Sequence, residues 1–186
     1  MQEEIRNTAH AFRQGELVLY PSDTLWGIGC DACNAEAIGQ LQNCKPRNKT
    51  GFIILVANDG MLQRYVSDIP DVAWELIDSS EKPLTIIYDQ ANGIAPGVTA
   101  DDGSIAVRLV KDGFIHKVIH QLGRPIVSTS ANFSGEPSPM NYKEISKTLI
   151  EKMGYCVAEN TYKSLNLQAS SIIKLSGKGD VKIIRR

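Results

Sequence analysis

The chain has 186 residues, of which 42% are hydrophobic and 22% are charged, and its formal net charge is −1. This length suits one well-buried domain. The near-zero net charge excludes a protein that gathers nucleic acid through an overall basic field, so any anion binding must be local.

No apolar run approaches the roughly 18 residues that a membrane span requires. The N-terminal segment 1–16 is acidic and amphipathic, which is unlike a signal or transit peptide. We therefore expect a cytoplasmic protein without membrane contact.

Apolar periodicity predicts helices that alternate with strands. The first helix has Ile5, Ala9 and Phe12 at helical spacing and is expected to end near Gly15. Further helices are expected at 35–44, at 58–79 with a break near Pro70, at 114–123, and at 142–153, where Asn141 and Glu144 resemble a capping box.

Runs rich in apolar residues predict the strands, which lie at 17–20, 52–57, 83–88, 105–110, 125–130, 155–160, 170–175 and 181–186. The segment 21–32 contains two glycines and small polar residues, and we expect a loop there. The interleaved elements predict the α/β class: one domain over residues 1–186 with a twisted, mixed β-sheet flanked by helices.

Positive charge is densest in "KPRNK", which contains Lys45, Arg47 and Lys49. This stretch could be a solvated loop, a nucleic-acid patch or a phosphate clamp. Arg108 interrupts an apolar strand, so it must find an anion, either a carboxylate of the protein or a ligand.

Small hydroxyl residues gather where the predicted strands end. Ligand sites of α/β sheets favour such ends, and hydroxyls can bind phosphate or carboxylate oxygens without adding bulk. Because serine and threonine also populate ordinary loops, both interpretations stay open. The residues are Ser22, Thr24, Thr85, Thr99, Ser128, Thr129, Ser130, Ser134, Ser138, Ser170 and Ser171.

The sequence shows no familiar metal or nucleophile pattern. The Cys-x-x-Cys pair formed by Cys30 and Cys33 has no second half, and no carboxylate completes a site with His116 and His120. No P-loop and no nucleophile–base pair is present either. We expect reduced thiols, solvated histidines and no metal site.

Six blocks, in order, resemble the motifs of the YrdC family, and the chain is identified as a member of that family. The second and fifth blocks match its K-x-R and S-x-N signature. The blocks are "YPSDTLWGIGCDA" at 20–32, "KPR" at 45–47, "KPLT" at 82–85, "GVTADDGSIAVR" at 97–108, "PIVSTSANFSGEPSP" at 125–139 and "SSIIKLSGKGDVKIIRR" at 170–186.

The resemblance implies an α/β fold with a deep, positively lined cavity. It also implies that L-threonine, bicarbonate and ATP are converted to threonylcarbamoyl-AMP and pyrophosphate. A partner transferase would then use the product to make N6-threonylcarbamoyladenosine in tRNA.

Carried over motif by motif, the resemblance implies roles for individual residues. Lys45 and Arg47 would be catalytic by neutralising the triphosphate of ATP, with Mg²⁺. Thr24, Arg108 and Ser128 would bind threonine. Nucleotide contacts would come from Arg47, Lys49, Thr99, Ser130, Asn132, Ser138 and Arg185.

The chain departs from the family pattern at several places. Trp26 stands where tyrosine is usual, Lys174 stands where aspartate is usual, and Glu81 with Lys82 replaces Pro-Gly. The segment after Arg47 is shorter than usual, and "LVKDG" replaces a proline-containing turn.

Two alternatives remain open. One is a module of the same family that contacts tRNA or double-stranded RNA, or acts in ribosome maturation, as a YciO-like paralogue without synthase activity. Another is a carbamoyl-adenylate-forming domain like those of hydrogenase maturation factors.

Overall fold

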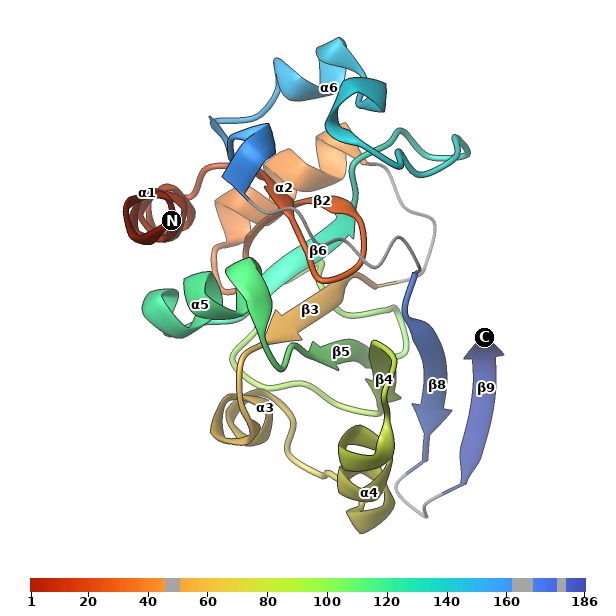
Figure 1. Ribbon diagram of the computed structural model, residues 1–186. Helices are drawn as coiled ribbons and strands as arrows, with labels where there is room; N and C mark the ends of the chain where they lie inside the picture. Colours follow the sequence, from red (N-terminus) through yellow and green to blue (C-terminus); the bar gives the residue numbers. More distant parts are fainter. Residues whose placement is uncertain (46–50, 162–168, 177–179) are drawn as a thin grey trace.

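The computed structural model describes residues 1–45, 51–161, 169–176 and 180–186 (Figure 1). Within these residues, nine strands form one sheet in the order β7-β1-β2-β6-β3-β5-β4-β8-β9. The strands are β1 (Val18–Pro21), β2 (Trp26–Asp31), β3 (Ile53–Val56), β4 (Leu84–Tyr88), β5 (Ile105–Leu109), β6 (Ile126–Ser130), β7 (Tyr155–Cys156), β8 (Ser171–Leu175) and β9 (Val181–Arg185).

The sheet is mixed, as predicted. The pairs β1–β7, β3–β5 and β4–β8 are parallel, and the other pairs are antiparallel. The helical segments are α1 (Gln2–Arg13), α2 (Ala35–Cys44), α3 (Asp59–Tyr65), α4 (Asp71–Ser79), α5 (Gly113–Leu122), α6 (Lys147–Ile150) and the short 3₁₀ turns η1 (Tyr142–Glu144) and η2 (Glu159–Thr161).

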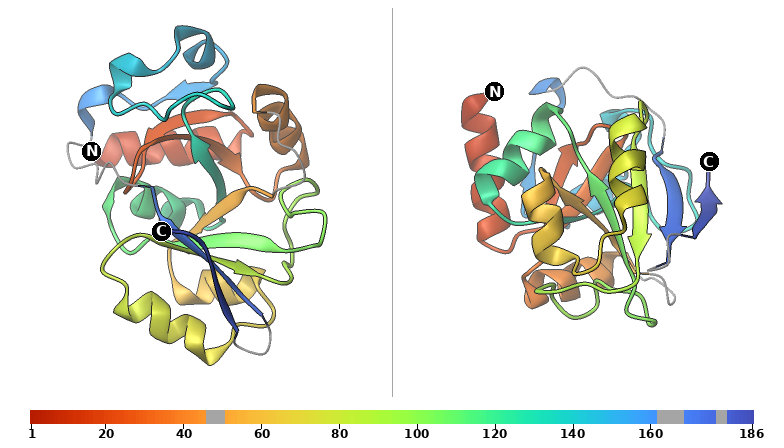
Figure 2. Two further views of the ribbon diagram at one scale, coloured as in Figure 1. Left: turned by 90° about the vertical axis from the view of Figure 1, so that its right-hand side faces the viewer. Right: turned by 90° about the horizontal axis from the view of Figure 1, so that it is seen from below.

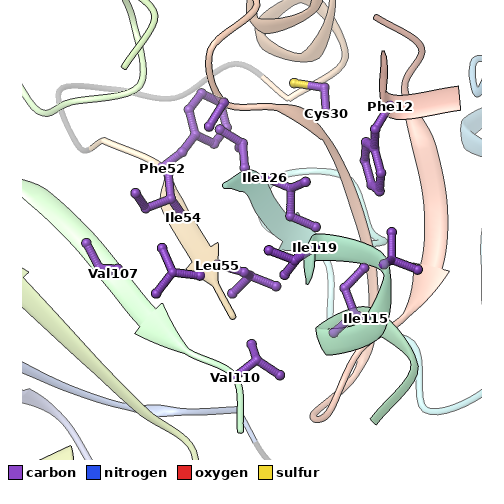
Figure 3. Close-up of a cluster of buried hydrophobic side chains, with 14 of the residues drawn as sticks. Phe12, Cys30, Phe52, Ile54, Leu55, Val107, Val110, Ile115, Ile119 and Ile126 are labelled. Atoms are coloured by element: carbon purple, nitrogen blue, oxygen red, sulfur yellow. The ribbon is translucent and has the colours of Figure 1, made fainter. Parts of the chain in front are cut away.

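Helices α1 and α5 pack against each other beside the strands (Figure 2). The core beneath α5 is aliphatic: Ile115 and Ile119 of this helix lie in one buried cluster with Leu55 and Ile126 of the sheet (Figure 3). Helix α5 ends before Gly123, whose φ of 74° is a left-handed conformation that glycine adopts without strain. No helix in the described residues is long and apolar enough to cross a membrane.

The prediction of a loop at 21–32 was wrong, because Trp26–Asp31 form the fully buried strand β2 between β1 and β6. Glycine serves here for close approach rather than for a turn. A Cβ atom at Gly29 would lie 1.9 Å from the carbonyl oxygen of Val127 in β6. Only a residue without a side chain fits this point of the sheet.

We expect Gly29→Ala to lower the free energy of unfolding by about 3 kcal/mol or more, because backbone must move to accept the methyl group. Gly39→Ala is the matched control: no atom lies within 4 Å of its added Cβ, and the residue is inside α2. That change should raise stability by about 0.5–1 kcal/mol. Urea denaturation of both variants measures the contrast, and equal effects would contradict this interpretation of Gly29.

The predicted helix at 142–153 was also wrong in extent. Asn141 Oδ1 accepts a hydrogen bond from Lys143 N at 3.1 Å, but the turn it caps stops at Glu144. Ile145 then adopts an extended conformation with its side chain buried, and α6 covers only Lys147–Ile150. Burial of Ile145 outweighs the local helix preference. The strand predicted at 155–160 was too long, because β7 covers only Tyr155–Cys156 and the turn η2 begins at Glu159. The remaining predicted helices and strands are confirmed to within a few residues.

Candidate active site

A pocket of about 140 Å³ lies where β6 ends, beside the start of β2, and it also takes in side chains from β5 and β9. Six residues that the sequence predicted for a site line it together: Thr24, Arg108, Ser128, Ser130, Ser138 and Arg185. They come from four separate parts of the chain, and the fold brings these residues from different motifs into one pocket. Hydroxyl groups and guanidinium groups dominate this set, which suits an anionic ligand.

The turn between β1 and β2 directs Thr24 into the pocket. The Ser22 hydroxyl oxygen accepts hydrogen bonds from Thr24 N and Leu25 N, both at 3.1 Å. It also donates to Leu25 O at 2.7 Å and lies 2.9 Å from Thr24 Oγ1. Such a serine-based turn fixes the backbone on both sides of Thr24.

Arg108 in β5 is buried, with 6% of its side chain exposed. Its Nη2 donates to Asp23 Oδ1 at 2.8 Å, and its Nη1 lies 3.4 Å from Thr24 Oγ1. Its Nε has no hydrogen-bond partner among the described residues. The anion predicted for Arg108 is therefore a carboxylate of the protein, that of Asp23. The Nε–H of Arg108 has no acceptor among the described residues.

Arg185 approaches the pocket from the edge strand β9. Its Nε and Nη2 donate to Ser170 O at 3.1 and 2.8 Å. Burial and the nearby Arg108 cation lower the pKa of Arg185. The two positively charged guanidinium groups repel each other, and an anion bound between them would reduce that repulsion.

Ser128 of β6 accepts a hydrogen bond from the hydroxyl of Tyr20 at 2.8 Å. Burial raises the pKa of Tyr20, so this phenol stays protonated and remains the donor. The Ser128 hydroxyl hydrogen is then available to a ligand in the pocket.

Lys45 connects the two halves of the family signature. Its Nζ donates to Ser130 O at 3.0 Å and also to Asn132 O, although these residues are more than 80 positions away. The amide nitrogen of Asn132 donates to the carbonyls of Phe133 and Glu136, and its buried Oδ1 has no partner among the described residues. Lys45 therefore fixes the segment that follows β6.

The pocket does not take in every predicted site residue. Three that the structure describes do not line it: Lys45, Thr99 and Asn132. Thr99 lies beside Gly51, where an added Cβ would be 2.8 Å from the Thr99 carbonyl carbon. Arg47 and Lys49 lie outside the described residues. The roles assigned to all of the predicted site residues stay predictions, as does the deep, positively lined cavity.

Two departures from the family pattern have structural partners. Trp26 lines the pocket and packs edge-on against Tyr142, with ring centroids 5.1 Å apart. Lys174 in β8 forms an ion pair with Asp102 at 3.2 Å. Hydrogen bonds from Ser104, together with Lys174, lower the pKa of Asp102 to about 2.

This shift predicts a pH dependence. Because the folded pKa is below the ordinary value near 4, the ionised carboxylate stabilises the fold above that value and ceases to do so as the pH falls through about 2. Asp102→Asn should lower stability slightly at pH 7, since the pair is exposed, and the difference should vanish by about pH 2. Thermal unfolding of wild type and variant across this range measures it; a difference that grows at low pH would contradict the assignment.

Metal and thiol chemistry has little support in the part of the chain that the structure describes. There, no three histidine, cysteine or acidic side chains come together as metal ligands. Cys30 is buried, and burial raises its pKa to about 12, so it stays a thiol. His116 Nε2 lies 3.1 Å from the carbonyl oxygen of Ala57.

Fold and pocket define an α/β protein with a pocket of hydroxyls and arginines at strand ends. The family model Sua5_yciO_yrdC, described as "Telomere recombination", matches residues 10–186. The chain therefore belongs to the Sua5/YciO/YrdC family, which confirms the resemblance seen in its motifs.

A curated relative from Pseudoalteromonas translucida, named threonylcarbamoyl-AMP synthase, is 32% identical over 85% of this chain and 87% of its own length. Several curated relatives have this name, which denotes an enzyme of the nucleotidyltransferase type. The chain is thus a member of an enzyme family.

Solved structures agree on the fold. Sua5 of P. abyssi, complexed with L-threonine, has a TM-score of 0.82 and 27% identity, and the match covers 92% of this chain. The chain spans half the length of that Sua5 protein. YciO of E. coli has a TM-score of 0.85, covers 100% of this chain and 90% of its own, and at 18% identity supports the fold alone.

Proposed function

We propose that this protein makes threonylcarbamoyl-AMP and pyrophosphate from L-threonine, bicarbonate and ATP, for modification of tRNA. The observation that carries the proposal is the gathering of Thr24, Arg108, Ser130 and Arg185 around one pocket. Relatives named for this activity and the threonine complex of P. abyssi Sua5 support it.

The chemistry balances without a covalent enzyme intermediate. The deprotonated amine of threonine bonds to the carbon of bicarbonate, one water leaves, and N-carboxy-threonine forms. A carboxylate oxygen of this carbamate then bonds to the α-phosphorus of ATP. The bond from that phosphorus to its bridging oxygen breaks, and pyrophosphate departs.

Every reactant in the second step is anionic, so catalysis rests on positioning and charge neutralisation. In the proposal, Arg108, Thr24 and Ser128 bind threonine. Contacts to the nucleotide come from Ser130, Asn132, Ser138 and Arg185, and from Arg47, Lys49 and Thr99. Lys45 and Arg47 neutralise the triphosphate, and ATP enters as its magnesium complex.

The product is a mixed anhydride that a tRNA-modifying transferase would consume, so a transferase partner and a cytoplasmic location belong to the proposal. The deciding experiment is a pyrophosphate-release assay with ATP, bicarbonate and each amino acid in turn. Release that requires both threonine and bicarbonate supports the proposal. Pyrophosphate release that does not depend on threonine would contradict the proposal.

The runner-up is a family module that binds tRNA or double-stranded RNA without synthesis. A salt-dependent affinity for tRNA that exceeds the affinity for ATP, together with no pyrophosphate release, would favour it.

A further inference from the structure

Asp23 is a half-buried acidic residue beside the site, and the predicted mechanism gives it no role. It lies in the turn between β1 and β2, directly before Thr24. Its side chain is 20% exposed, and its Oδ1 forms the 2.8 Å ion pair with Arg108. Among the described residues, no other carboxylate pairs with this guanidinium.

The ion pair with Asp23 involves only one of the three guanidinium nitrogens of Arg108, Nη2. Asp23 accepts from Nη2, the contact from Nη1 to Thr24 is long at 3.4 Å, and Nε is buried with no partner among the described residues. A buried donor without an acceptor costs free energy in the ligand-free protein. Asp23 holds the planar guanidinium through Nη2, and the Nε–H is therefore available to donate to a ligand atom.

Asp23 itself does not line the pocket that holds Arg108. Asp23 instead lines a second cavity of about 300 Å³, together with Leu84, Leu109 and Lys111. The side-chain contact that connects Asp23 to the first pocket is its ion pair with Arg108.

The charge of Asp23 has a second consequence. Arg108 and Arg185 line the same pocket, and two guanidinium cations held close together repel each other. A carboxylate at 2.8 Å offsets part of the charge of Arg108 and lets the two arginines share one pocket. Without it, Arg108 would be free to turn toward solvent or toward another acceptor.

We propose that Asp23 is a positioning residue that holds Arg108 by Nη2 so that its Nε–H meets the carboxylate of the amino-acid substrate. This inference rests on the proposed function, because it names the carboxylate of the amino-acid substrate as the acceptor for the Arg108 Nε–H. Asp23 contacts neither substrate nor reacting atoms.

The test compares Asp23→Ala and Asp23→Glu with wild type. Steady-state pyrophosphate release should show the KM for threonine raised about tenfold or more in Asp23→Ala, with the KM for ATP changed less than about twofold. Asp23→Glu keeps the anion and should recover most of the threonine affinity. The matched control is Asp102→Asn, which removes an ion pair outside the pocket and should leave both KM values unchanged.

A calorimetric titration separates positioning from general damage and needs no turnover. Wild type should bind L-threonine about tenfold or more tightly than L-threonine amide, which lacks the carboxylate, and Asp23→Ala should lose this preference. An equal preference in wild type and Asp23→Ala overturns the proposal, as does an equal rise of both KM values. If wild type releases no threonine-dependent pyrophosphate, the synthase proposal fails, and the titration alone decides the role of Asp23 by the same criterion.

Discussion

Replacing Arg108 by alanine is expected to lower kcat/KM for threonine by about 100-fold or more. The change removes a buried cation that we propose binds the threonine carboxylate, and loss of a charge-assisted hydrogen bond costs about 3 kcal/mol. It also leaves Asp23 without its partner at 2.8 Å, so the free energy of unfolding should fall by about 1–3 kcal/mol. Pyrophosphate-release kinetics and urea denaturation measure the two effects separately.

The double variant Asp23→Ala/Arg108→Ala is the control for this interpretation. Removing both charges leaves no unpaired carboxylate, so stability should return toward that of wild type while activity stays low. If the double variant regains activity along with stability, Arg108 has only a structural role. If Arg108→Ala alone keeps near-wild-type kcat/KM, the threonine-binding role is wrong.

The periodicity of the sequence was sufficient for most of the fold, and the exceptions have identifiable causes. The glycines that suggested a loop before residue 32 lie in the buried strand β2, because the carbonyl of Val127 approaches Gly29 too closely for any side chain. A single sequence gives no sign of such an approach, since it depends on the neighbouring strand. Ile145 ends the predicted helix at 142–153 for a similar reason: its burial is set by the rest of the core.

The motifs predicted much of the site but not its supporting contacts. An arginine inside an apolar strand predicted that an anion lies nearby. Nothing in the sequence identified Asp23, 85 residues earlier, as that anion. Tyr20 behind Ser128 was missed in the same way. These residues act through other side chains, and only the sheet topology brings them within hydrogen-bonding distance.

Lys45 shows how the structure changed the interpretation of a predicted residue. The cluster "KPRNK" suggested a phosphate clamp, but the Lys45 amine donates to the carbonyls of Ser130 and Asn132 in the ligand-free protein. Lys45 is 4% exposed, so these contacts lie in a buried environment. Its charge can still act on a phosphate held by the segment that it fixes.

We therefore expect Lys45→Met to lower both activity and stability. The Asn132 carbonyl would lose the Lys45 donor, whereas the Ser130 carbonyl would keep its hydrogen bond from Asn132 N at 2.9 Å. A buried acceptor that loses its donor costs about 1–3 kcal/mol, and the segment after β6 would loosen. Turnover should fall about 100-fold or more, since a phosphate-binding segment and a nearby cation are both lost. The measurements are urea denaturation and pyrophosphate release at saturating ATP.

Lys111→Met provides the matched control. Lys111 also donates to two carbonyls, those of Ile77 at 2.7 Å and Ser80 at 3.4 Å, but it is exposed, and both carbonyls belong to the end of α4 and not to the segment after β6. Its loss should cost little stability and leave turnover unchanged. Equal losses of turnover in the two variants would mean that capping carbonyls, and not proximity to the nucleotide, explains the effect of Lys45. Near-wild-type turnover in Lys45→Met would contradict the phosphate-neutralising role proposed for Lys45.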